Sequence, residues 1–141
     1  MPERLILDTT IIVRALVSDH PRHTDIARRL LEASDRGKVI LVVLPVVLAE
    51  CVFVLQSFYD QPRAQISTTL YTLLTSSGIE IEESPIYLDA LLRYKKSKFH
   101  FTDCVLAAHA AARDLPIASF DADFKRFSDV KLADLEIFRP N

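Results

Sequence analysis

The chain has 141 residues, of which 50% are hydrophobic and 26% charged, the composition of an ordinary folded protein. This length predicts one domain, residues 1–141, that can bury a full core. The net charge of −2 argues against a protein that coats nucleic acid through a basic surface alone. No membrane span is expected, because the longest apolar stretch, Val39 to Ala49, is short and interrupted by Pro45.

The rare residue types narrow the possible functions. Only Gly37 and Gly78 are present, so the glycine-rich loops that bind nucleotide phosphates are excluded. Each glycine follows a helical pattern, where a left-handed residue commonly ends a helix. Cys51 and Cys104 have apolar neighbours and no metal-binding spacing, which predicts buried thiols in a reducing compartment. The first residues do not resemble a signal peptide, so a cytoplasmic location is expected.

Short apolar runs alternate with helical patterns along the whole chain. The predicted strands are Leu5–Leu7, Val39–Val43, Ile79–Ile81, Ile117–Ser119 and Leu135–Ile137. The predicted helices are Ile11–Val17, His23–Arg36, Val46–Phe58, Pro62–Ser76, Pro85–Lys96 and Thr102–Arg113, the last with Thr102 as its N-cap. Strands that alternate with helices predict an α/β fold, a parallel sheet flanked by helices in an α/β/α sandwich.

Four acidic residues, Asp8, Glu50, Asp103 and Asp121, follow or interrupt these apolar runs. An ionised carboxylate in apolar surroundings is unfavourable unless a cation or hydrogen bonds compensate it. Asp8 and Asp121 each follow a predicted strand, and ligands of parallel sheets bind at the carboxyl ends of the strands. Asp103 opens a predicted helix, and Glu50 lies in the helix after the second strand. Together the four predict the divalent-metal site of a hydrolase.

Each acid also has a simpler interpretation. Asp8 could cap the helix that follows it, and Asp103 could stabilise its own helix N-terminus. Asp121 and Asp123 could be turn residues. Glu50 is the hardest to explain in this way, because no basic residue lies three or four positions away to pair with it.

The histidines carry a weaker signal than the acids. His20, His23, His100 and His109 lack metal-ligand spacing and are interpreted as structural or surface residues. A nucleophilic Cys104 would need a histidine base, and only its proximity to His100 in the sequence supports one.

The acids lie in four segments: Leu5–Thr10, Ala49–Glu50, Phe101–Ala108 and Ser119–Phe124. In order and spacing these segments resemble the acidic motifs of PIN-domain ribonucleases. The length and layout most resemble the VapC-type toxins of bacterial toxin–antitoxin pairs. The resemblance implies a three-layer sandwich with a five-stranded parallel sheet, an acidic pocket that binds Mg²⁺ or Mn²⁺, and endonucleolytic cleavage of RNA.

The resemblance also assigns roles by position. Asp8, Glu50, Asp103 and Asp121 match the metal-site acids, and Asp123 matches a frequent auxiliary acid. Ser119, Thr9 and Thr10 match residues that support these acids. The family usually has Thr-Asn after the first aspartate, so Thr10 replaces an amide with a hydroxyl.

Partners follow from the same resemblance: an RNA substrate, a cognate antitoxin protein and a second copy in a homodimer. The candidates for contact with the RNA backbone are Arg14, Arg93, Lys95, Lys96 and Lys98. The simpler interpretation of the last four is a solvated helix end. The apolar Val46–Phe58 and Pro62–Ser76 helices could form an antitoxin or dimer surface, and core burial explains them equally well.

Three rival functions remain open from the sequence. A PIN nuclease could act in RNA processing without an antitoxin. A metal-dependent phosphatase would typically carry an aspartate at position 10, where this chain has Thr10. A non-catalytic protein-binding module of the same fold would usually lose its acids.

Overall fold

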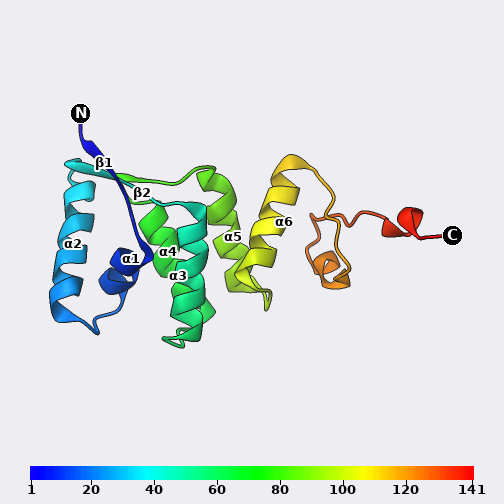
Figure 1. The fold of residues 1–141 in the computed structure, drawn as a ribbon, viewed down its shortest axis with the longest axis horizontal. Coiled ribbons are helices and arrows are strands. Elements are labelled where there is room, and N and C mark those ends of the chain that lie inside the picture. The colour runs from blue at the N-terminus through cyan, green and yellow to red at the C-terminus, as the bar shows by residue number, and fades with distance from the viewer.

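In the computed structural model, which describes residues 1–141, the chain has an α/β fold with six α-helices and a three-stranded parallel sheet (Figure 1). The elements are β1 (Glu3–Ile6), α1 (Thr9–Leu16), α2 (Pro21–Asp35), β2 (Val39–Val42), α3 (Pro45–Ser57), α4 (Arg63–Leu74), β3 (Ile79–Glu80), α5 (Ser84–Lys96) and α6 (Phe101–Arg113). Two short 3₁₀ helices follow, η1 (Ala122–Arg126) and η2 (Leu135–Phe138). We call residues 1–113 the N-terminal body and residues 114–141 the C-terminal arm.

The sheet has the strand order β1-β2-β3, with Leu5 opposite Leu41 and Leu41 opposite Ile79. The prediction of five strands is wrong for this structure. Ile117 forms only an isolated parallel bridge with Leu132, away from the sheet. The predicted strand 135–137 is the 3₁₀ helix η2, because the Asp134 carboxylate accepts a hydrogen bond from the Glu136 amide and tightens the backbone into a turn.

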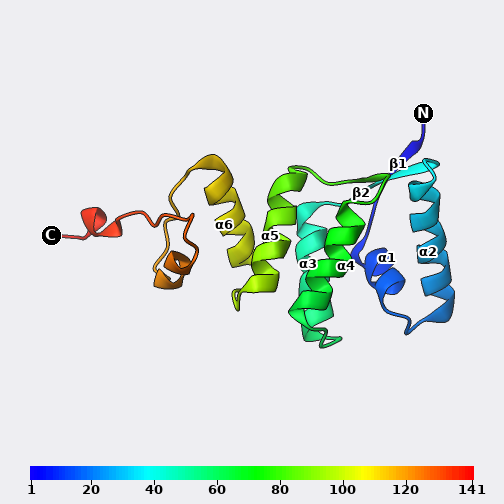
Figure 2. The same ribbon diagram turned by 180° about the vertical axis from the view of Figure 1, so that it is seen from behind.

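The predicted third layer is also missing from the body. Figures 1 and 2 place the helices on one side of the strands. On β2, Val39 and Leu41 are buried against these helices, whereas Ile40 and Val42 on the other face are half-buried. The sheet therefore has one covered and one partly open face, because no helix returns over the second face.

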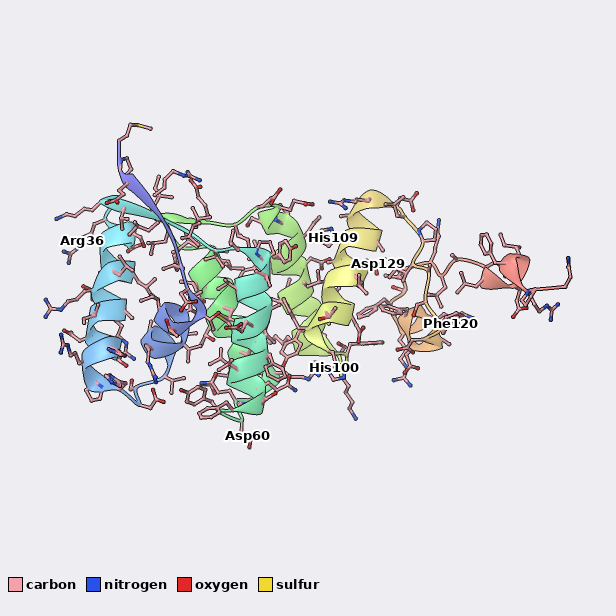
Figure 3. All side chains as sticks on the ribbon, in the orientation of Figure 1. Arg36, Asp60, His100, His109, Phe120 and Asp129 are labelled. Carbon is pink, nitrogen blue, oxygen red and sulfur yellow. The ribbon has the colours of Figure 1, made fainter.

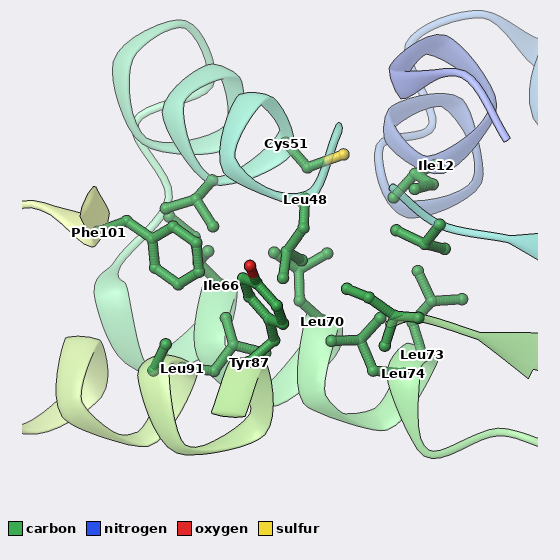
Figure 4. Close-up of a cluster of buried hydrophobic side chains, with 14 of the residues drawn as sticks. Ile12, Leu48, Cys51, Ile66, Leu70, Leu73, Leu74, Tyr87, Leu91 and Phe101 are labelled. Carbon is green, nitrogen blue, oxygen red and sulfur yellow. The ribbon is translucent and has the colours of Figure 1, made fainter. Parts of the chain in front are cut away.

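The core of the body contains 21 buried residues from both the strands and the helices (Figure 4). Leu48 and Cys51 from α3, Leu70 from α4 and Leu91 from α5 are completely buried. A second, much smaller cluster joins Ala107 of α6 to Phe124 and Val130 of the arm. The arm is therefore attached to the end of the helical layer and reaches the main core only through Phe127, which is partly buried against it.

The glycines and cysteines lie as predicted. Gly37 and Gly78 have φ angles of +77° and +79°, and each follows a helix. At Gly78 a Cβ atom would lie 2.2 Å from the carbonyl oxygen of Ser34, so only glycine fits. Both cysteines are free and buried. No helix of this chain has the length and apolar character needed to cross a membrane.

The predicted start of the last helix was wrong. α6 begins at Phe101 with His100 as its N-cap, and no side chain makes a capping hydrogen bond there. Phe101 is buried in the core next to Tyr94, so packing of this aromatic ring extends the helix beyond Thr102.

Candidate functional site

Asp8 lies just beyond the carboxyl end of β1 and is the N-cap of α1. Its Oδ2 accepts hydrogen bonds from the Thr10 hydroxyl at 2.6 Å and the Thr10 amide at 3.4 Å. The bond from the Thr10 side chain is the main reason that the pKa of Asp8 is lowered. The helix-capping interpretation of Asp8 is thus correct, and it leaves an ionised carboxylate exposed to solvent at the edge of the sheet.

Glu50 is exposed on α3 and makes no ion pair, so the expectation of a carboxylate buried in an apolar run was wrong. The helix is apolar around it because α3 carries both core residues and exposed apolar residues such as Val46 and Phe53. The Glu50 side chain is therefore exposed to solvent and needs no buried partner.

Asp8 and Glu50 both lie close enough to the buried thiol of Cys51 to act on it electrostatically. The pKa of Cys51 is raised to about 12, first by burial and next by the negative charge of Glu50, with a smaller contribution from Asp8. A hydrogen bond from the side chain of Thr9 acts in the opposite direction. The structure therefore brings two of the predicted acids into one neighbourhood, where α1 packs on α3.

Asp103 lies in the first turn of α6 and is half-buried. A cleft of about 280 Å³ separates the start of this helix from α3, lined by Ala49, Val52, Phe53, Gln56, His100, Phe101 and Thr102. Glu50 and Asp103 each follow a lining residue directly in the sequence. Their helices pack together, so both acids lie on elements that form this cleft, although neither lines it.

Asp121 and Asp123 lie in the arm, beyond α6 (Figure 1). The Asp121 carboxylate accepts a hydrogen bond from the Asp123 amide at 2.9 Å and caps η1. The hydroxyl of Ser119 accepts one from the Asp121 amide at 3.0 Å. The turn interpretation of these two acids is therefore correct in this structure.

The four predicted acids do not converge within one chain. No group of three or more His, Cys, Asp or Glu side chains is arranged to hold a metal ion. For Asp121 the physical reason is the path of the chain after α6. Asp114 adopts a left-handed conformation with φ of 51°, and the arm then leads away from the sheet that carries Asp8 (Figures 1 and 2).

The two arginines predicted to bind RNA, Arg14 and Arg93, both pair with carboxylates of this chain. Arg93 is only 12% exposed; it pairs with Asp89 at 2.9 Å and binds Asp129 of the arm through both terminal nitrogens. Arg14 pairs with Asp19 at 2.8 Å. Arg93 therefore attaches the arm to α5, a role that the sequence did not reveal because Asp129 lies 36 positions away.

The three predicted lysines are exposed and make no ion pairs: Lys95, Lys96 and Lys98. Lys96 and Lys98 line a cleft of about 610 Å³ between α5 and the arm. Arg126 of η1 lines the same cleft, together with Asp123. Arg126 was missed in the sequence because a single basic residue in a turn carries no signal until the fold places it beside other cations.

The PIN-domain family model matches residues 5–130, and the chain therefore belongs to the PIN-domain family. PIN domains are a nuclease family that typically uses divalent metals, and a nucleic acid substrate is implied. No curated protein matched the chain in the comparison.

Proposed function

We propose that this protein is a metal-dependent endoribonuclease that hydrolyses RNA phosphodiester bonds and acts as the toxin of a type II toxin–antitoxin system. The observation that carries the proposal is the PIN-domain match over residues 5–130, which contains all the predicted acids. The acids that would serve the reaction are Asp8, Glu50, Asp103 and Asp121, with Asp123 as an auxiliary acid.

The chemistry of these acids suits Mg²⁺ or Mn²⁺, because hard cations prefer carboxylate oxygens. Asp8 is ionised and held in place by Thr10, and Glu50 is exposed nearby. A single chain nevertheless groups no three acids that could hold an ion, so its residues do not form a complete metal site. Thr9 and Thr10 lie beside Asp8, in the part of the proposed site that the body contains.

Binding of the RNA backbone is assigned to the cleft that contains Lys96, Lys98 and Arg126. These cations can neutralise phosphates, and the exposed Lys95 lies beside them on α5. Arg93 and Arg14 are excluded from this role because each is at most 32% exposed and pairs closely with a carboxylate, whereas Arg126 is 73% exposed and only 3.8 Å from Asp123.

The exposed apolar surface of α3 supports a protein partner, which we propose to be the antitoxin. Val46, Phe53 and Phe58 are all more than two-thirds exposed. The other predicted surface, α4, is different, because Ile66, Leu70 and Leu73 are buried in the core. The antitoxin surface is thus restricted to α3.

The test is cleavage of RNA by the wild type and by Asp103→Asn, with Mg²⁺ or Mn²⁺ and with a chelator. We expect cleavage only by the metal-loaded wild type, with a loss of about 100-fold or more in the variant. Asp25→Asn is the matched control, because Asp25 is an exposed acid on α2 that pairs only with Arg29. Equal cleavage by the wild type and Asp103→Asn would overturn the proposal.

The toxin role has its own test. Expression of the wild type should arrest growth, whereas Asp103→Asn should be tolerated. A cleaving enzyme that leaves growth unchanged would instead be a PIN nuclease of RNA processing.

A further inference from the structure

The loop between α5 and α6, residues 97–100, connects two parts of the proposed site. Lys96 precedes the loop and Lys98 lies in it, and both line the cleft assigned to RNA. Asp103 lies in the first turn of the helix that follows. His100, the last residue of the loop, lies where the two helices meet (Figure 3). The distance between the RNA cations and this acid therefore depends on how firmly the loop is held.

The two helix ends beside this loop have few local hydrogen bonds. α5 ends without a glycine, and its C-cap, Ser97, is extended, with φ of −134° and ψ of 177°. No side chain caps the start of α6. Within the loop, the Ser97 hydroxyl accepts a hydrogen bond from the Phe99 amide at 3.3 Å. The last carbonyl groups of a helix have no partner inside it, so those of α5 need one from elsewhere.

Arg63, the first residue of α4, supplies such a partner. Its Nη1 donates to the carbonyl oxygens of Tyr94 at 3.2 Å and of Phe99 at 2.6 Å. Its Nη2 donates to the carbonyl oxygen of Lys98 at 3.1 Å. The guanidinium also lies over the Tyr94 ring, with Cζ 4.2 Å from the ring centroid. One side chain thus connects the end of α5 to the loop that leads to α6.

The positive charge of Arg63 has no carboxylate partner. Arg63 takes part in none of the ion pairs of the chain. A cation is favourable at the C-terminal end of a helix, because the peptide dipoles give that end a partial negative charge. A guanidinium presents several N–H groups in one plane and can stack on a ring at the same time, whereas an ammonium is a compact point charge. Lysine would therefore not reproduce this contact.

The loop in turn places groups of the cleft and of α6. The ring of Phe99 stacks on Phe127 of the arm, with centroids 4.6 Å apart, and Arg126 directly precedes Phe127. Phe101, which follows the loop, is buried in the main core as the first residue of α6. A shift of the loop would therefore displace the RNA cations on both sides of the cleft relative to the acid in α6.

We propose that Arg63 is a positioning residue, which holds the α5–α6 loop so that the cations of the RNA cleft stay in a fixed relation to Asp103; this inference rests on the proposed function. Arg63 does not line the RNA cleft, so it acts through the backbone of the loop. Its loss should lower the rate of cleavage more than the affinity for RNA. Exposed lysines still bind phosphates when the loop is loose, whereas a misplacement of about 1 Å can lower the rate about 100-fold.

The test compares Arg63→Lys with Ser67→Ala, a matched control on the same helix. The buried Ser67 hydroxyl donates to the Leu91 carbonyl of α5 at 2.7 Å, so its removal loosens the same pair of helices but removes no hydrogen bond to the loop. In Arg63→Lys we expect kcat for RNA cleavage to fall about 100-fold, with KM changed less than about threefold. In Ser67→Ala both constants should stay near their wild-type values.

Equal losses of kcat in the two variants would overturn the proposal, since they would follow from weaker packing of α4 on α5. A rise in KM with an unchanged kcat would also overturn it, because Arg63 would then serve RNA binding itself. Circular dichroism identifies a variant that fails to fold. Arg63→Gln, which keeps N–H donors without the charge, then replaces Arg63→Lys.

Amide hydrogen exchange of residues 97–103, measured without RNA, tests the same contact independently of activity. Exchange there should be about tenfold faster in Arg63→Lys, because hydrogen bonds to a charged group are lost, and unchanged in Ser67→Ala. Unchanged exchange in Arg63→Lys would overturn the hold of Arg63 on the loop. A wild type that cleaves no RNA would overturn the proposed function, and the exchange measurement would still decide whether Arg63 holds the loop.

Discussion

The N-terminal body and the C-terminal arm differ in how many of their apolar side chains they bury. The body encloses 21 buried residues in one core, whereas the arm contributes only Phe124 and Val130 to a small cluster with Ala107. The large apolar residues left exposed in the arm are Leu115, Phe120, Ile137 and Phe138. The body thus contains nearly all of the buried apolar surface, whereas the arm rests on it through one small cluster and the Arg93–Asp129 pair.

The same two regions each hold an acidic side chain by the same local hydrogen bond. In the body the Asp8 carboxylate accepts from the Thr10 amide two positions later, and in the arm the Asp121 carboxylate accepts from the Asp123 amide in the same way. Only Asp8, however, follows a strand within the sheet. The comparison shows that local turn chemistry can place an acid correctly in each segment without bringing the two acids together.

The largest expected effect tests whether the body folds independently of the arm. Leu70→Ala removes a completely buried side chain from the main core and should lower the free energy of unfolding by about 2–5 kcal/mol. Phe124→Ala removes a larger side chain from the small cluster, so it should speed amide hydrogen exchange in the arm while shifting the denaturation midpoint of the body much less. Urea denaturation and hydrogen exchange measure both. A midpoint shift as large as that of Leu70→Ala would show that arm and body unfold as one unit.

A second prediction uses pH to probe the body alone, because both cysteines lie there. The thiol of Cys51 has a pKa of about 12 in the folded chain against a usual value of 9.0. Above pH 9 the unfolded state loses this proton while the folded state keeps it, so stability falls as pH rises toward 12. The expected contribution is about 1.4 kcal/mol per pH unit.

Cys51→Ala is the comparison for this measurement, since tyrosines and lysines titrate over the same range in both proteins. Urea denaturation between pH 8 and 10.5 should show a shallower loss of stability in the variant. Parallel curves for the two proteins would mean that the Cys51 thiol is not isolated from solvent.

The smallest expected effect concerns Asp8, the exposed acid that follows β1. Thr10→Val removes the hydroxyl that donates to Asp8, so the lowered pKa of Asp8 should rise toward its usual value of 3.8. The stabilisation that this hydrogen bond supplies is present above that value and is lost as pH falls through the lower pKa of the folded chain. An NMR titration of the carboxyl carbon follows it directly. Thr72→Val, which removes an exposed hydroxyl bond on α4, should leave Asp8 unchanged.

Local patterns predicted most of the body. The three observed strands and all six helices lie where apolar runs and helical periodicity indicated, because each is determined by side chains within a few residues. The alternatives of Asp8 as a helix cap and Asp121 as a turn residue were correct for the same reason. The predicted strand 135–137 failed because Asp134 turns the backbone there. Thr102 failed as an N-cap because burial of Phe101 extends the helix.

The candidate site shows the limit of this reasoning more clearly. The order and spacing of the acids indicated the PIN-domain family, which the family match confirms. The prediction that these acids lie close together depends on tertiary structure. It fails for Asp121 because the turn at Asp114 directs the arm away from Asp8. Likewise, the sequence does not reveal that Arg93 pairs with Asp129, because the two residues are 36 positions apart. Only the fold brings Asp129 against Arg93, which also pairs with Asp89.

The sequence by itself determined the alternation of strands and helices, the left-handed glycines, the buried thiols and the family. Tertiary structure decided which predicted strands join the sheet, which cations stay free to bind phosphate, and how many acids one chain can gather. The physical reason is one of range. Helix caps, turns and periodic faces depend on neighbours along the chain, whereas sheet pairing and a shared acidic site depend on where a single turn sends residues more than a hundred positions from the first strand.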